Sequence, residues 1–209
     1  MKIVSASYEI LTPIDGGEIL KLIEKIGRVC YKSEERITET SAPAFVKMLI
    51  NRGHEAMLEH YNLTVKFITD RGVSHEIVRH RVASFAQEST RYCNYKSEVT
   101  FIDPRPVFWP YASGYDEQLR RDSWRASCEV AEEMYMEMLD KGATPQEARS
   151  VLPNSLKTEI VVTANLREWR HILKLRTASV AHPQMREIMC PLLDELKILV
   201  PVVFEDITY

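Results

Sequence analysis

The hydrophobic and polar positions of the chain follow two periods, one typical of helices and one typical of strands. After Asp15, apolar side chains recur every three or four positions, as on the buried face of a helix. Between residues 61 and 69 apolar and polar side chains alternate, and many are β-branched or aromatic, which predicts a strand. The same patterns predict further strands at residues 2–10, 157–164 and 198–204, and short strands or extended loop at 88–102. They predict a short helix at 72–82, further helices that begin near residues 15, 41, 116, 144, 165 and 183, and a proline-rich loop at 103–115.

Several predicted helices have recognisable ends. An N-cap side chain followed three residues later by glutamate is the spacing of a capping box. The chain contains this spacing in the pairs Asp15 and Glu18, Thr144 and Glu147, and Asn165 and Glu168. Helices outnumber strands and do not alternate strictly with them. We therefore expect an α+β fold, with helices packed on a mostly antiparallel sheet, in a single domain over residues 1–209.

The composition narrows the class of protein. With 209 residues, 45% hydrophobic and 27% charged, the chain has the composition of a globular protein. A net charge of −3 argues against a dedicated nucleic-acid-binding protein, so any basic site must be local. The seven glycines form neither a G-x-G-x-x-G motif nor a P-loop. A bound phosphate would therefore need side chains, helix N-termini or other backbone groups.

The cysteines and histidines do not form a recognisable metal or redox motif. The four cysteines lie far apart and none belongs to C-x-x-C. His54-Glu55 and His75-Glu76 lack the second histidine of H-E-x-x-H, so we expect no metal site. The first residues lack the apolar core of a signal peptide, and no apolar run is long enough for a membrane span. We expect a cytoplasmic protein with reduced thiols and no membrane partner.

One short segment concentrates positive charge. Residues 79–92 contain three arginines and one glutamate, and Ser89 and Thr90 add hydroxyl donors. The arginine fork matches the geometry of phosphate, so the segment could bind an anion; it could equally be a solvated basic face. Phe85, Tyr92 and Tyr95 are interleaved with the arginines, as in a surface on which bases stack. A non-catalytic nucleotide- or nucleic-acid-binding module is therefore the alternative to an enzyme.

The same segment resembles the signature of the flavin-dependent thymidylate synthases. That signature is Arg-His-Arg, seven residues and then serine, which stands here as Arg79-His80-Arg81 and Ser89. The similarity continues at Gly53-His54-Glu55, at Ala148-Arg149-Ser150-Val151-Leu152-Pro153, at Asn165-Leu166-Arg167 and at Leu175-Arg176. The resemblance implies a homotetramer that holds FAD between subunits. It also implies reductive methylation of dUMP to dTMP, with NADPH as reductant of the flavin, methylenetetrahydrofolate as carbon donor and no cysteine nucleophile.

The resemblance further implies roles for individual side chains. Arg176 would be catalytic, because a cation against the uracil favours loss of the N3 proton and so activates C5. The expected cofactor contacts are His54, Arg79, His80, Arg81, Gln87, Asn165, Arg167 and His171. The expected dUMP contacts are Glu76, Arg79, Gln87, Glu88, Ser89, Thr90, Arg91, Arg149 and Arg176. The chain departs from the family pattern at Cys30, Ala56, Glu76, Ala86-Gln87 and His171, where the family has other residues.

Overall fold

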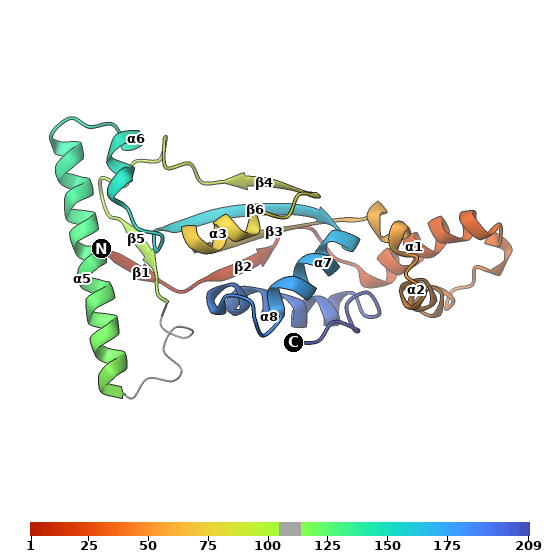
Figure 1. Ribbon diagram of the computed structural model, residues 1–209. Helices are drawn as coiled ribbons and strands as arrows, with labels where there is room; N and C mark the ends of the chain where they lie inside the picture. Colours follow the sequence, from red (N-terminus) through yellow and green to blue (C-terminus); the bar gives the residue numbers. More distant parts are fainter. Residues whose placement is uncertain (105–113) are drawn as a thin grey trace. The chain divides into compact units, whose positions relative to one another are not determined.

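The computed structural model describes residues 1–104 and 114–209 (Figure 1). The strands are β1 (Lys2–Val4), β2 (Ser7–Ile10), β3 (Asn62–Asp70), β4 (Ala83–Gln87), β5 (Thr100–Ile102) and β6 (Lys157–Asn165). The helices are α1 (Gly16–Tyr31), α2 (Ala42–Asn51), α3 (Arg71–Ile77), α5 (Gly114–Asp140), α6 (Pro145–Ala148), α7 (Leu166–Thr177) and α8 (Pro183–Leu199). Short 3₁₀ turns are η1 (Glu34–Arg36), η2 (Glu55–His60) and η3 (Arg149–Val151). Within the described residues, no helix is both long and apolar enough to cross a membrane.

Four strands form one sheet in the order β2-β3-β6-β4, and neighbouring strands run in opposite directions (Figure 1). Alternate residues of β3 and β6 are buried, as expected for strands that pack one face against a core. Strands β1 and β5 form a separate parallel pair with Lys2 opposite Thr100. The expected mixture of helices with an antiparallel sheet is thus confirmed.

The chain divides into two compact units, each assembled from several segments. Unit 1 comprises Met1–Tyr8, Lys66–Arg79 and Phe85–Val161, and unit 2 comprises Glu9–Val65, His80–Ser84 and Val162–Tyr209. In unit 1, buried side chains of β5 and α5 form a core that includes Phe101, Cys128 and Tyr135. The expectation of one domain over residues 1–209 stays a prediction.

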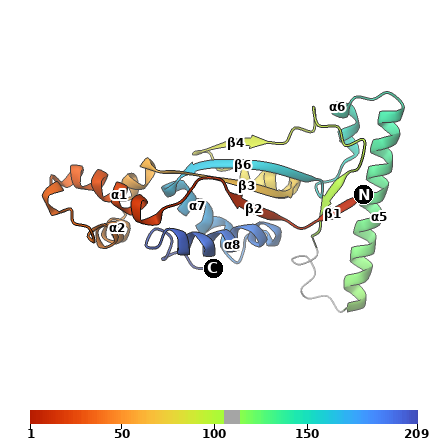
Figure 2. The same ribbon diagram turned by 180° about the vertical axis from the view of Figure 1, so that it is seen from behind.

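Unit 2 is organised around α7 and α8, which pack side by side (Figures 1 and 2). Trp169 of α7 is fully buried, and its indole N–H donates to the carbonyl of Leu63 at 2.9 Å. At the start of α1, a Cβ on Gly16 would lie 2.2 Å from the carbonyl oxygen of Leu199. Only glycine allows this approach, so the first helix begins directly against the end of the last one.

The local helix signals are confirmed. The Asp15 side chain accepts a hydrogen bond from the Glu18 N–H at 3.0 Å, and α1 starts at the next residue, Gly16. Thr144 and Glu147 form a complete capping box at the start of α6. The strands predicted at 61–69 and 157–164 correspond to β3 and β6, and the long helix predicted from 116 corresponds to α5.

Three local predictions were wrong. The strand predicted at 2–10 is two strands, β1 and β2, which belong to different sheets. The helix predicted to run from 72 to 82 ends at Ile77, and the residues soon after it form β4. Residues 198–204 are not a strand, because α8 continues to Leu199 and turns follow. Val203 and Phe204 are fully buried, so this run is apolar because it packs in a core. Most of the loop predicted at 103–115 lies outside the described residues.

Candidate active site

Helix α7 positions most of the polar side chains of the site in unit 2. Its N-cap is Asn165, whose side-chain oxygen accepts from the Glu168 N–H at 2.9 Å. The apolar face of α7 is buried through Leu166, Trp169, Ile172 and Leu173. The opposite face therefore presents Arg167, His171 and Lys174 to the surface.

Two neighbouring cavities of unit 2 share Arg167 and Glu55. A cavity of about 500 Å³ is lined by residues that include Glu55, Asn165, Arg167, His171 and Lys174. A second, of about 390 Å³, is lined by residues that include Cys30, Tyr31, His54, Ala56 and Arg167. The Arg167 guanidinium lies 2.5 Å from Glu59, but its side chain is 54% exposed, so this ion pair is weak and exchangeable. Arg167 could thus contact an anionic group in either cavity.

His80 and Arg176 are brought together although 96 positions separate them in the sequence. Arg176 donates its Nε–H to Nε2 of His80 at 3.0 Å. Burial, together with the nearby charges of Arg176 and His171, lowers the pKa of His80 to about 4. His80 is therefore neutral at pH 7. Because Nε2 accepts a hydrogen bond, the single ring proton lies on Nδ1.

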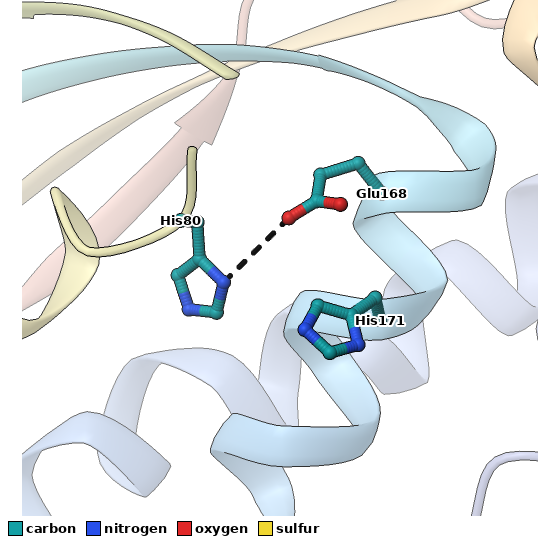
Figure 3. A group of neighbouring side chains, drawn as sticks. All are labelled: His80, Glu168 and His171. Carbon is teal, nitrogen blue, oxygen red and sulfur yellow. Dashed lines mark ion pairs between the residues drawn. The ribbon is translucent and has the colours of Figure 1, made fainter. Parts of the chain in front are cut away.

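Two further side chains of α7 face the His80 ring (Figure 3). A carboxylate oxygen of Glu168 lies 3.7 Å from Nδ1 of His80. The His171 ring meets the His80 ring edge-on, with 6.0 Å between their centroids. Nitrogen or oxygen atoms of these three residues lie within 4.8 Å of one another, which is close enough for a metal. The Arg176 cation hydrogen-bonded to His80 disfavours a second cation there, so the cluster does not change the expectation of no metal site.

The turn after β4 builds the anion-binding features of unit 1. Backbone N–H groups of Tyr92 and Cys93 donate to the Ser89 carbonyl and close the turn. Thr90 is buried within it and accepts a hydrogen bond from Arg149 at 3.0 Å. Arg91 donates to Gln146 at 3.0 Å. The turn thereby fixes two arginines that lie far apart in the sequence.

A cavity of about 460 Å³ beside this turn can hold an anion. Its lining includes Arg71, His75, Thr90, Arg149 and Asn154. None of the described residues that line it is acidic, whereas the lining offers cations, hydroxyls and an amide. Such donors match the oxygens of a phosphate.

Two predicted contact residues turn their side chains toward other groups of unit 1. Gln87 donates its side-chain N–H to Ser74 at 2.8 Å and to Thr158 at 3.2 Å. The Glu88 carboxylate accepts from the Tyr95 hydroxyl at 2.6 Å and from Lys157 at 3.2 Å. Burial and the Glu88 carboxylate together raise the pKa of Tyr95. A role of Gln87 or Glu88 toward a ligand stays a prediction.

The remaining predicted site residues are placed as follows. Glu76 is partly buried on α3, and Arg79 and Arg81 are exposed on either side of the buried His80. The Ser89 hydroxyl accepts from the Arg91 N–H at 3.3 Å. His54 lies 2.6 Å, through Nδ1, from the Tyr31 hydroxyl.

Sequence reasoning missed Arg71, His75, Glu168 and Lys174 as site residues. The sequence did contain a signal for Arg71 and His75. Asp70 caps α3 by accepting from the Val73 N–H at 2.7 Å, so Arg71 and His75 are four positions apart near the start of a helix. That spacing puts both side chains on one face.

The cationic cavity of unit 1 could bind an anion, and the arginine–histidine pair of unit 2 holds a cation beside a neutral imidazole. The family described as "Thymidylate synthase complementing protein" matches residues 16–202. The chain therefore belongs to this family, whose relatives carry the name flavin-dependent thymidylate synthase, and it is a methyltransferase.

Individual relatives extend this result over most of the chain. The flavin-dependent thymidylate synthase of Corynebacterium glutamicum is 34% identical, covering 96% of this chain and 84% of its own. The flavin-dependent thymidylate synthase of Geobacter sulfurreducens is 32% identical, and the match covers 86% of this chain and 78% of that relative. A solved structure of the UMP/dUMP methylase PolB from Streptomyces cacaoi, bound with 5-Br dUMP, has a TM-score of 0.83 at 26% identity. It covers 98% of this chain and 96% of its own.

Proposed function

We propose that the protein converts dUMP to dTMP by reductive methylation, with methylenetetrahydrofolate as carbon donor and FAD reduced by NADPH. The observation that carries the proposal is the family match over residues 16–202, which includes the Arg79-His80-Arg81 segment. Membership of an enzyme family favours this activity over a non-catalytic nucleic-acid-binding module.

The nucleotide phosphate is assigned to the cationic cavity of unit 1. Arg149 and Thr90 are already hydrogen-bonded to each other, so the donors are held in place before a ligand arrives. Arg71, which lines the same cavity, adds a second fork. Ser89 and Arg91 complete the expected contacts from the turn after β4.

In the homotetramer that we expect, the family resemblance assigns the pyrimidine to Arg176. Its guanidinium is always charged and stabilises negative charge as the N3 proton leaves. His80 is neutral at pH 7, so it adds no second positive charge beside Arg176. Deprotonation makes C5 of the ring the nucleophile toward the methylene carbon.

The two cavities of unit 2 are assigned to FAD from the family resemblance; they offer donors to the cofactor beside the carboxylates of Glu55, Glu59 and Glu168. Arg167 lies in both and can exchange its exposed ion pair for an anionic diphosphate, and His54, Asn165 and His171 add hydrogen-bonding groups. When bound, FAD supplies the electrons of the reduction. Cations at its N1 edge, such as the exposed Arg79 and Arg81, would stabilise the reduced form.

Three further properties belong to the proposal. We expect a homotetramer, with each flavin site completed by neighbouring subunits. We expect the cytoplasm as compartment, in keeping with the free thiols of all four cysteines. We expect dUMP rather than UMP as substrate, because the relatives that are 32–34% identical are named thymidylate synthases.

The test is an activity assay with single omissions. The purified protein should show flavin absorbance and should form dTMP only when dUMP, methylenetetrahydrofolate and NADPH are all present. Replacing dUMP by UMP should abolish the product. Light scattering after size-exclusion chromatography should give about four chains per particle. Product formed without flavin or without folate, or preference for UMP, would contradict the proposal.

A further inference from the structure

The buried His80 ring lies between two side chains of one helix. Glu168, in the first turn of α7, approaches Nδ1, and Arg176, in the last turn, donates to Nε2. Each ring nitrogen thus faces a different partner, a carboxylate on one side and a guanidinium on the other. His80 itself is 6% exposed and belongs to another segment of the chain, and its ring faces the Glu168 carboxylate (Figure 3).

The direction of the Arg176 hydrogen bond requires one tautomer of His80. An arginine Nε–H can only donate, so Nε2 of His80 must be unprotonated. In the other tautomer, two N–H groups would face each other and the hydrogen bond between Arg176 and His80 would be lost. The Glu168 carboxylate favours the required tautomer, because negative charge beside Nδ1 attracts the N–H dipole that this tautomer places there.

The hydrogen bond to His80 contributes to the orientation of Arg176. Its long side chain can adopt many rotamers, whereas its planar fork must meet the pyrimidine edge in one orientation. The hydrogen bond from Nε to His80 restrains the plane of the guanidinium. Arg176 is only partly buried, so packing alone restrains it less than it restrains His80.

We propose that Glu168 is a positioning residue, which acts through the tautomer and orientation of His80 to hold Arg176 in its productive orientation. The inference rests on the proposed function, because it takes Arg176 as the group that activates the pyrimidine. Glu168 itself is not expected to touch the nucleotide. Carboxylates that orient a functional histidine typically change its effect by about 10–100-fold when they are removed.

The experiment compares Glu168→Ala and Glu168→Gln with a control, Glu205→Gln, in the flavin-loaded protein. Glu205 carries the same charge in unit 2, but it pairs at 3.7 Å with the exposed Lys47. Nitrogen NMR of histidine-labelled protein reports which ring nitrogen of His80 is protonated, and circular dichroism reports folding. Steady-state and half-reaction kinetics separate kcat and KM for dUMP from reduction of the flavin by NADPH.

We expect Glu168→Ala to shift the His80 tautomer signals and to lower kcat for dTMP formation by about 10–100-fold. KM for dUMP and flavin reduction should each change by less than about threefold. Glu168→Gln should retain part of kcat, because its amide oxygen keeps a partial negative charge near Nδ1–H, and Glu205→Gln should match the wild type. In an Arg176→Lys background, adding Glu168→Ala should cause little further loss, because two residues that act through one contact are not additive.

Two results would overturn the inference. One is an unchanged His80 tautomer in both Glu168 variants. The other is a loss of kcat in Glu168→Ala that is equally large in the wild-type and the Arg176→Lys backgrounds. If the wild-type protein made no dTMP at all, the proposed function would fail, and the tautomer signals would still decide whether Glu168 sets the proton on His80. If Glu168→Ala does not fold, the same comparisons are made with Glu168→Gln.

Discussion

Two ion pairs of unit 2 offer a matched test of how burial controls the strength of a charge pair. Asp206 and Glu59 are both 44% exposed, and each pairs with an arginine of α7. Asp206 contacts Arg170, which is 2% exposed, whereas Glu59 contacts Arg167, which is 54% exposed. We compare Asp206→Ala with Glu59→Ala, so that the same group is removed from a buried and from an exposed cation.

The magnitude follows from what remains around each arginine. Arg170 donates to both oxygens of Asp206, at 2.7 and 2.8 Å, and also contacts Glu55 and the carbonyl of Val203. Breaking a buried pair typically costs about 3–5 kcal/mol, and since Glu55 still faces Arg170 we expect the lower end, about 3 kcal/mol. For Glu59→Ala we expect about 0–1 kcal/mol, because Arg167 is returned to water.

Urea unfolding of the flavin-free protein gives the change in the free energy of unfolding, and thermal unfolding gives the change in Tm; both are followed by circular dichroism. For a chain of this size, Tm should fall by about 6–12 °C in Asp206→Ala and by less than about 4 °C in Glu59→Ala. Hydrogen bonds from Arg170 lower the pKa of Asp206, so its contribution is present at neutral pH and is lost as pH falls through the lowered pKa. The difference between wild type and Asp206→Ala should therefore shrink in acid. Equal losses in the two variants, or a loss below about 1 kcal/mol in Asp206→Ala, would refute the reasoning from burial.

The other predictions concern the proposed reaction. Arg149→Ala should weaken dUMP binding by about 10–100-fold in calorimetry, because a charge-assisted hydrogen bond of roughly 1.5–3 kcal/mol is lost, and should leave deoxyuridine binding unchanged. Arg176→Lys keeps the charge but loses the planar fork, so dTMP formation should fall by about 10²–10³ while flavin reduction by NADPH changes much less in stopped-flow measurements. Normal turnover in Arg176→Lys would mean that another residue activates the base. Replacing all four cysteines by serine should leave measurable dTMP formation, and loss of turnover in a folded, flavin-loaded protein would show that a thiol takes part.

The sequence alone was sufficient to predict structural features that depend only on residues within one helical turn. The caps at Asp15, Thr144 and Asn165 need only a side chain and the backbone three residues later, so local spacing predicts them. Strand β4 was missed because Ala83–Gln87 has no strong local preference, and its conformation depends on pairing with β6, which lies far along the chain.

The same distinction applies to the site. The motif at residues 79–81 drew attention to His80, and the family resemblance drew attention to Arg176. Their hydrogen bond joins residues 96 positions apart, and no periodicity or motif spacing reports on such a contact. Glu168 was predicted only as part of a helix cap, yet its side chain also faces His80. The backbone N–H of Glu168 therefore completes a helix cap, while its side chain faces a residue far away in the sequence.

The close approach of Gly16 to Leu199 has a consequence for synthesis on the ribosome. It joins the first helix of the chain to the last, so unit 2 cannot complete its packing until almost the whole chain has emerged. Unit 1 draws most of its residues from Lys66–Val161, which are available earlier. During translation, α1 and α2 can pack against each other early, whereas the start of α1 must wait for the end of α8 and stays open to aggregation and to chaperones until then.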